Sequence, residues 1–338
     1  MLKIGIIGFG FMGKMHFRCW KAIEEAQVVA ICDIDPANFT STAGTAGNIA
    51  GAEQPLDFTG VEFFTNAEVM FDKMELDAVS ITLPTYLHAE YTLMALKAGV
   101  NVLCEKPMAM GPAECDRMTA AARESGKMLQ IGHCIRFWPQ YAKAKEIIDS
   151  RQYGDVLAAT FQRLSLTPVW SWQNWLLDGS KSGGAILDMH IHDSDFVQYV
   201  FGVPESVFCR GAKGPSADYD HVVSNYIYMD EKVITAEGGW VMAPGFGFQM
   251  SFNIVLQRAT IVFDSTRNPN FKICPHEGES FTPAIETGDG YSREIRHFAD
   301  AMLGKKVPDI LTPEQSSDSV KLVLAEKMSA DTGNLIKP

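Results

Sequence analysis

Ten residues near the middle of the chain, ILDMHIHDSD at 186–195, contain three aspartates and two histidines. Side chains of these types bind metal ions, transfer protons, or form a polar helix face without chemistry. The apolar residues around them recur at helical rather than alternating spacing, which predicts a helix from about Gly184 to Phe201. The chemistry open to this stretch therefore depends on which side chains share a face of that helix.

A metal site is the less favoured interpretation of this helix. His190 and His192 are two positions apart, and on a helix such residues point to nearly opposite sides. Asp188, His192 and Asp195 instead follow the i, i+4, i+7 spacing of one face. Because histidine exchanges protons near neutral pH, we expect Asp188 and His192 to form a proton-transfer pair. A hydrogen bond used only for helix packing is the alternative, and we expect no metal ligand.

A second group of residues, at the start of the chain, has the spacing of a dinucleotide-binding turn. Gly8, Gly10 and Gly13 follow a strand-like run and precede a helix-like one. The first glycine permits a tight turn, the second lets a pyrophosphate approach the backbone, and the third lets helix and strand pack closely. The helix N-terminus attracts the anion. We expect a nucleotide site here; glycines that serve only a tight turn are the alternative.

Asp33 indicates which nucleotide the turn accepts. It ends the second strand-like run, twenty positions after Gly13, where a carboxylate can accept hydrogen bonds from the adenosine ribose. No Lys or Arg lies from Ala22 to Asp72. A 2′-phosphate would therefore meet Asp33, and Asp35 nearby, without a local cation. We expect NAD as the cofactor, with NADP less favoured.

A lysine follows the buried strand-like run VNVLC. In Glu105-Lys106-Pro107 this lysine lies beyond the carboxyl end of a strand, which is where ligands bind in an open α/β sheet. Pro107 restricts the backbone of Lys106 and could thereby aim the ammonium group. A solvated surface lysine beside a strand-ending proline is the alternative.

The elements that must position these groups divide the chain in two. Up to about residue 131, near-continuous apolar runs alternate with helical patterns, which predicts a doubly wound parallel sheet of the Rossmann type. From about residue 150, apolar runs with Gly, Pro and Asp breaks predict a large, mostly antiparallel open sheet, and a last helix is capped at Thr312 and stops at Gly333. We expect an α/β protein with a dinucleotide-binding domain at 1–131 and a second, α+β domain at 132–338.

The composition argues against several other classes of protein. A net charge of −12 without a basic cluster argues against a nucleic-acid partner. No apolar run reaches the roughly 18–20 residues that span a bilayer, so we expect no membrane association. The first residues lack the order of a signal peptide, and the seven cysteines are scattered without a C-x-x-C pair. We therefore expect a cytoplasmic protein with reduced cysteines.

Three stretches together resemble a known family. The glycine turn, TLPTYLHAEYTLMALKAGVNVLCEKPMAM and GGAILDMHIHDSDFVQYVFG look like the Gfo/Idh/MocA family of oxidoreductases. That family includes inositol dehydrogenases, glucose–fructose oxidoreductase and many sugar dehydrogenases. The likeness covers nearly the whole chain. It implies a Rossmann domain followed by a domain whose open sheet often mediates oligomerisation, here into a homodimer or homotetramer.

The resemblance also implies roles for individual residues. Asp188 and His192 match the Asp and His that line the family's active site together with the lysine of Glu-Lys-Pro, here Lys106. His190 is expected to be a structural or peripheral histidine. The expected cofactor-binding residues are Gly8, Gly10, Phe11, Met12, Gly13, Asp33, Thr82, Leu83, Pro84, His88, Glu105 and Lys106. The expected substrate-binding residues are Arg136, Tyr291 and Trp175, which is one of three tryptophans whose faces could stack on a sugar or serve the core.

These residues predict an NAD-dependent oxidoreductase acting on a secondary alcohol of a sugar, inositol or related polyol. Lys106 would donate to the alcohol oxygen and His192 would accept its proton. Two alternatives stay open. One is an NAD-dependent glycoside hydrolase that removes and returns a hydride. The other is a sugar- or NAD-sensing protein without chemistry, against which the proton acceptor His192 counts.

Overall fold

The computed structural model describes residues 1–40 and 55–338, and contacts divide the chain into two compact units. The first unit comprises Met1–Cys134 and Asp289–Ser317, and the second comprises Ile135–Gly288 and Asp318–Pro338. The described residues before the gap at 41–54 end in α2 (Ala37–Thr40).

The first unit is built on a parallel sheet with the strand order β3-β2-β1-β4-β5-β6. Its strands are β1 (Leu2–Ile7), β2 (Ala26–Cys32), β3 (Glu62–Phe64), β4 (Ala78–Ile81), β5 (Asn101–Glu105) and β6 (Leu129–Gly132). The Rossmann architecture predicted for this part of the chain is confirmed. The order also brings the carboxyl ends of β1, β4 and β5 side by side, which is where the glycine turn and Lys106 begin.

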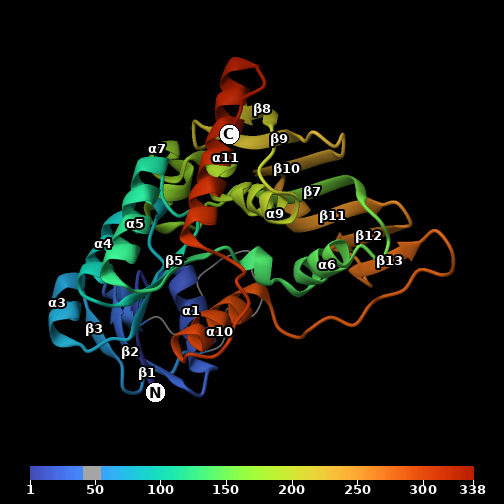
Figure 1. The fold of residues 1–338 in the computed structure, drawn as a ribbon. Helices are drawn as coiled ribbons and strands as arrows, with labels where there is room; N and C mark the ends of the chain where they lie inside the picture. Colours follow the sequence, from blue (N-terminus) through green and yellow to red (C-terminus); the bar gives the residue numbers. More distant parts are fainter. Residues whose placement is uncertain (41–54) are drawn as a thin grey trace. The chain divides into compact units, whose positions relative to one another are not determined.

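Helices cover both faces of this sheet, which explains why its strands are apolar on both sides. Figure 1 shows α4 and α5 on one face, and α1 with α10 on the other. The helices of the unit, with one 3-10 turn, are α1 (Phe11–Lys21), α3 (Ala67–Lys73), η1 (Thr85–Leu87), α4 (His88–Lys97), α5 (Pro112–Ser125) and α10 (Gly290–Met302).

The place of α10 differs from the expected domain division, which assigned everything after residue 131 to the second domain. Trp20 on α1 is fully buried, and its ring meets Phe298 on α10 edge to face, with centroids 6.4 Å apart. Arg296 on α10 also binds Glu25, which follows α1, at 2.7 Å. Residues 289–317 therefore pack with the nucleotide-binding unit. A sequence-based division into two continuous segments cannot detect such a return of the chain.

The second unit is built on a mostly antiparallel sheet with the strand order β13-β12-β11-β7-β10-β9-β8, in which β7 and β10 are the parallel pair. Its strands are β7 (Val156–Leu166), β8 (Ser206–Lys213), β9 (Tyr219–Ile227), β10 (Val233–Met242), β11 (Phe248–Leu256), β12 (Ala259–Asp264) and β13 (Phe271–Pro275). This confirms the predicted α+β architecture.

Helices of the unit pack against this sheet. The helices and 3-10 turns are η2 (Cys134–Phe137), α6 (Pro139–Ser150), η3 (Trp172–Leu177), α7 (Gly179–Ser182), α8 (Gly184–Asp188), α9 (Ile191–Phe201), η4 (Pro244–Phe246) and α11 (Pro313–Thr332). Of these, α8 contacts β9 and β10, and α9 contacts β7 and β10. The predicted cap of α11 is present, because Thr312 Oγ1 accepts from Gln315 N at 3.3 Å and Gln315 Oε1 accepts from Thr312 N at 3.4 Å. None of the described helices is long and apolar enough to cross a bilayer.

Aromatic packing and buried ion pairs hold α9 in the second unit. Phe196 on α9 packs against Tyr141 of α6 and Phe161 of β7. The Arg163 guanidinium of β7 donates to both oxygens of Asp193, at 2.8 and 3.2 Å, and both side chains are buried. This pair ties the first turn of α9 to the central strand of the sheet.

Asp193→Asn should lower the free energy of unfolding by about 3–5 kcal/mol, because the Arg163 guanidinium would stay buried without its carboxylate. Urea denaturation measures the loss. Asp149→Asn on α6 is the matched control, since it removes an exposed carboxylate that pairs with Lys145, and it should change stability far less. Equal losses in the two variants would contradict the structural role of the Arg163–Asp193 pair.

Candidate functional site

The glycine turn has the geometry that its three positions require. Gly8 has a φ of +88°, and a β-carbon there would lie 2.9 Å from the carbonyl oxygen of Thr82. A β-carbon at Gly13 would lie 2.1 Å from the carbonyl oxygen of Gly8, so helix and turn pack too closely for any side chain. At Gly10 a β-carbon would have no described neighbour within 4 Å. The turn is therefore closed at Gly8 and Gly13 and open at Gly10, the position assigned to pyrophosphate.

Asp33 is held against this turn by backbone donors. Its Oδ2 accepts from Phe9 N at 2.5 Å, and its Oδ1 accepts from Asp35 N at 2.8 Å. Each carboxylate oxygen can accept a second hydrogen bond, and Asp33 is only half-buried. The carboxylate is thus oriented beside the turn with acceptor capacity for ribose hydroxyls.

The structure also places a cation near Asp33 that the local sequence did not reveal. Lys14, on α1, is 1% exposed, and its Nζ has no hydrogen-bond partner among the described residues. Burial and the charge of Arg18 lower the pKa of Lys14, while the charge of Asp33 opposes this shift. Lys14 lies outside residues 22–72, the range without Lys or Arg, on the helix that follows the glycine turn.

The loops after β4 and β5 are tied to each other and to the glycine turn. The Thr82 hydroxyl donates to the carbonyl oxygen of Gly8. The ring nitrogens of His88 lie 2.7 Å from the carbonyl oxygen of Pro107 and 2.8 Å from that of Leu83. Burial lowers the pKa of His88 despite these two carbonyls. Both ring nitrogens of His88 therefore face backbone carbonyls, and the side chain links the two loops.

Glu105 and Lys106 come directly from the end of β5. Glu105 is 5% exposed, its Oε1 lies 2.9 Å from His16 Nε2, and its Oε2 accepts from the backbone nitrogen of Lys106 at 3.1 Å. Lys106 itself is only half-buried. Glu105 is therefore a buried support for the backbone of Lys106, and its carboxylate is not exposed for cofactor binding.

In the second unit, the segment 186–195 is two helices rather than the predicted one. α8 ends at Asp188 and α9 begins at Ile191, and the amide of His190 donates to Ala185 O at 2.8 Å, one residue beyond the helical partner. His190 explains the break. Its Nε2 lies 3.0 Å from Glu326 Oε2, and a β-carbon at Gly238 would lie 2.6 Å from its Nδ1. The side chain is drawn into the sheet, which interrupts the helix; the expectation that His190 is structural fits this contact.

Burial separates the polar residues of this segment into two groups. His190, Asp193 and Asp195 are fully buried and bind partners within the unit. Asp188 and His192 are only half-buried. Asp188 and His192 are therefore the more accessible of these five side chains, and the other three hold the segment in place.

Arg136, an expected substrate-binding residue, pairs with a carboxylate of the protein. Its guanidinium donates to both oxygens of Asp195, at 2.9 and 2.7 Å, and the residue is 2% exposed. Its planar fork is therefore engaged by a carboxylate of the protein, which does not support a substrate contact. Trp175 lies half-buried in η3, where Gln173 and Asn174 adopt the left-handed conformation. Tyr291 packs against the core of the first unit.

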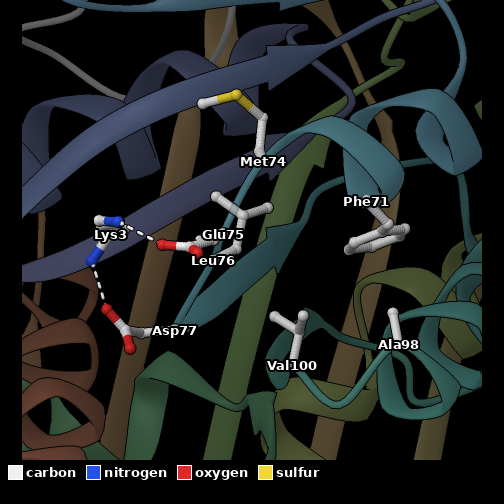
Figure 2. Close-up of a pocket in the computed structure, with 8 residues that line it drawn as sticks. All are labelled: Lys3, Phe71, Met74, Glu75, Leu76, Asp77, Ala98 and Val100. Atoms are coloured by element: carbon white, nitrogen blue, oxygen red, sulfur yellow. Dashed lines mark hydrogen bonds and ion pairs between the residues drawn. The ribbon is translucent and has the colours of Figure 1, made fainter.

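The pocket in Figure 2 belongs to the opposite edge of the first sheet. It is lined by Lys3, Phe71, Met74, Glu75, Leu76, Asp77, Ala98 and Val100. Lys3, Asp77 and Val100 stand at the amino ends of β1, β4 and β5. Lys3 Nζ lies 3.0 Å from Glu75 Oε2, and the backbone nitrogen of Lys3 donates to Asp77 Oδ2 at 2.7 Å. This pocket is therefore not part of the candidate site.

Comparison with known proteins agrees with the glycine turn and the two sheets. Residues 2–133 match the oxidoreductase family with an NAD-binding Rossmann fold, and residues 141–262 match the GFO/IDH/MocA C-terminal domain. The chain belongs to the Gfo/Idh/MocA family. Residues 2–133 carry the NAD-binding Rossmann fold of this oxidoreductase family, as the sequence predicted.

Individual members of the Gfo/Idh/MocA family share part or most of the chain. A 2,7-anhydro-N-acetylneuraminate hydratase of Mediterraneibacter gnavus is 32% identical over 61% of this chain and 51% of its own length. The chain thus spans about half the length of the first relatives that it matches. An inositol 2-dehydrogenase of Arthrobacter sp. is 25% identical over 89% of this chain and 86% of its own. A levoglucosan dehydrogenase, solved with NADH and levoglucosan, has the same fold, with a TM-score of 0.81, 21% identity and 99% coverage of both chains.

Gly10→Ala and Gly13→Ala should impair different properties, the first NADH binding and the second thermal stability. Gly10→Ala should keep the melting temperature and weaken NADH binding about tenfold or more, because the new methyl group enters the space above the turn. Gly13→Ala should lower the melting temperature, because its methyl group would overlap the carbonyl of Gly8. Thermal denaturation and NADH fluorescence titration measure the two effects.

Gly245→Ala is the control for this pair, since a β-carbon at Gly245 also has no described neighbour within 4 Å and the residue lies in the other unit. It should change neither property. Unaltered NADH binding by Gly10→Ala would exclude the turn from the cofactor site.

Proposed function

We propose that this protein catalyses NAD-dependent oxidation of a secondary alcohol on a sugar, inositol or related polyol. The observation that carries the proposal is the division of segment 186–195. Three of its titratable side chains are buried against partners, whereas Asp188 and His192 stay half-exposed. A carboxylate and an imidazole suit proton transfer. The NAD-binding domain would hold the cofactor that accepts the hydride.

In the proposed reaction the chain binds and orients the alcohol and handles its proton. NAD, when bound, supplies the hydride acceptor. Lys106 donates to the alcohol oxygen and stabilises the developing alkoxide, while His192 accepts the hydroxyl proton. Asp188 orients His192 or binds a neighbouring hydroxyl. The products are a ketone, NADH and the proton taken up by His192.

The substrate class rests on two supports. The relatives and the solved structure named above act on an inositol, a sialic acid anhydride and levoglucosan by their names, and all of these are polyhydroxylated rings. The segment 170–175 contributes three tryptophans, of which Trp172 is 42% exposed. Aromatic faces of this kind pack well on the C–H surface of a sugar ring.

A redox-neutral reaction is the second candidate, because the first relative that the chain matches is named a hydratase. Transient oxidation followed by return of the hydride would serve a hydratase or a glycoside hydrolase equally. Such an enzyme regenerates its NAD in each cycle. Net NADH therefore distinguishes the two candidates.

Incubation with NAD and a panel of inositols, sugars and sugar acids should produce NADH absorbance in step with ketone formation for at least one compound. Substrate loss at constant NADH would favour the redox-neutral candidate instead. Binding of NAD without conversion of any compound would favour a sensor.

Lys106→Ala should lower kcat by about 10²–10³-fold, the usual cost of one donor at a developing oxyanion, and leave the Kd for NAD nearly unchanged. Lys97→Ala, at an exposed position on α4, is the control and should behave like the wild type. Steady-state kinetics and NADH titration measure both quantities. Normal turnover by Lys106→Ala would remove this lysine from the mechanism.

We further propose a homo-oligomer that functions in the cytoplasm. Neighbouring strands of the second sheet expose apolar side chains, which are Val223, Ile227, Val233, Val241 and Val255. A row of this kind on neighbouring strands is suited to burial against a second copy. All seven cysteines are free, which fits a reducing compartment.

A further inference from the structure

A buried cluster beneath Lys106 has no part in the function proposed so far. His16 of α1, Glu105 of β5 and Glu294 of α10 each offer a ligand atom within 4.8 Å of the other two, and all three residues are buried. Glu294 is fully buried, and neither of its carboxyl oxygens has a hydrogen-bond partner among the described residues. A carboxylate in such a position must hold a proton or a cation to avoid a large desolvation cost.

The proton fits this cluster better than a metal ion does. A metal-bound histidine nearly always donates its second ring N–H to an acceptor, and His16 Nδ1 has no such partner within the described part of the chain. His16 instead uses its Nε2 atom for Glu105 Oε1, 2.9 Å away. Glu105 is then the anion of the cluster, since it accepts from His16 Nε2 and from Lys106 N.

The space around Glu105 is shaped for its carboxylate. A β-carbon at Gly132 would lie 3.2 Å from Glu105 Oε1 and 3.3 Å from Oε2. Burial by itself would raise the pKa of Glu105. The hydrogen bond and charge of His16 and the charge of Lys106 lower this pKa by more than burial raises it, so the net shift is downward. Glu105 is therefore ionised at neutral pH, and a second ionised carboxylate beside it would be strongly disfavoured.

We propose that Glu294 carries a proton in the folded protein and, with His16, acts as a positioning residue that keeps a single negative charge, on Glu105, next to Lys106. Two ionised carboxylates would compete for His16 and Lys106, and an unsupported Glu105 would release the Lys106 backbone. The inference rests on the proposed function, in which the Lys106 ammonium binds the substrate oxygen.

The surroundings of Glu294 favour the protonated form. Burial, followed by the charges of Glu105 and Asp289, raises the pKa of Glu294 well above its usual value. The titratable groups around it are His16 and Cys19 on α1, Glu105 at the end of β5, Asp289 at the cap of α10 and Tyr291 on α10. Burial, Asp289 and Glu294 in turn raise the pKa of Cys19 to about 12, so this thiol adds no charge near neutral pH.

The sign of the resulting pH dependence follows from proton binding. Between the ordinary pKa of glutamate and the raised pKa of Glu294, the folded state binds one proton more than the unfolded state. Stability must therefore fall as the pH rises through this window. The limiting slope is a tenfold decrease of the folding equilibrium constant per pH unit, or about 1.4 kcal/mol.

The test compares urea unfolding of the wild type, Glu294→Gln and Glu294→Met from about pH 5 to pH 9. Both variants are neutral and close in size to protonated glutamate. Their stability relative to the wild type should increase with pH, towards tenfold per pH unit. Glu124→Gln, at an exposed position on α5, is the matched control and should parallel the wild type. Parallel curves for both neutral variants would overturn the proposal.

A metal ion in the cluster is the second outcome that would overturn it. Metal analysis of the purified protein would then find one equivalent of a divalent ion in the wild type and none in Glu294→Gln, and EDTA would lower the melting temperature of the wild type alone. We expect no bound equivalent and no effect of EDTA.

The kinetic arm tests the link to Lys106. Glu105→Gln should lower kcat and leave the Kd for NAD nearly unchanged, because the Lys106 backbone loses the carboxylate that holds it, whereas Glu294→Gln should keep kcat within about twofold of the wild type. An unchanged kcat in Glu105→Gln would reject the positioning role. If no substrate is turned over, the proposed function fails, and the unfolding curves still decide the proton on Glu294.

Discussion

A buried ionisable side chain must have a partner or stay neutral, and this constraint organises both units of the protein. Arg163 binds Asp193, Arg136 binds Asp195, and His190 lies against Glu326, all within the second unit. Each of these contacts anchors the segment that follows α8. The charged groups of these residues are engaged by partners within the protein and are buried away from a ligand. Asp188 and His192 stand out because the anchoring leaves them half-exposed.

In the first unit, polar contacts hold several loops together at one edge of the sheet. Parallel strands deliver their loops to the same edge, but loops by themselves are mobile. Thr82 links the loop after β4 to the glycine turn, and His88 links it to Pro107 after β5. Glu105 then holds the backbone of Lys106. The polar residues of this edge thus form a connected support, and Lys106 is its half-exposed end.

Much of this could be predicted from the sequence, because the strongest signals are local. The glycine spacing depends on contacts within one βα turn, and the cap of α11 depends on residues three apart. The alternation of apolar runs and helices specifies a parallel sheet, since each strand must be buried on both faces. These predictions are confirmed. The single helix over 184–201 was wrong, because the pull on His190 comes from Glu326 and from the space at Gly238, both distant in the sequence.

The sequence by itself determined the two architectures, the nucleotide turn and the family, because each follows from spacing within a short stretch. Only the tertiary structure decided which charged side chains form buried ion pairs that hold other elements in place. The structure pairs Arg136 with Asp195, and it brings Glu294 of α10 beside His16 and Glu105. Spacing along one chain cannot reveal such pairings. Burial and charge act through space, and they join residues whose separation in the sequence carries no pattern.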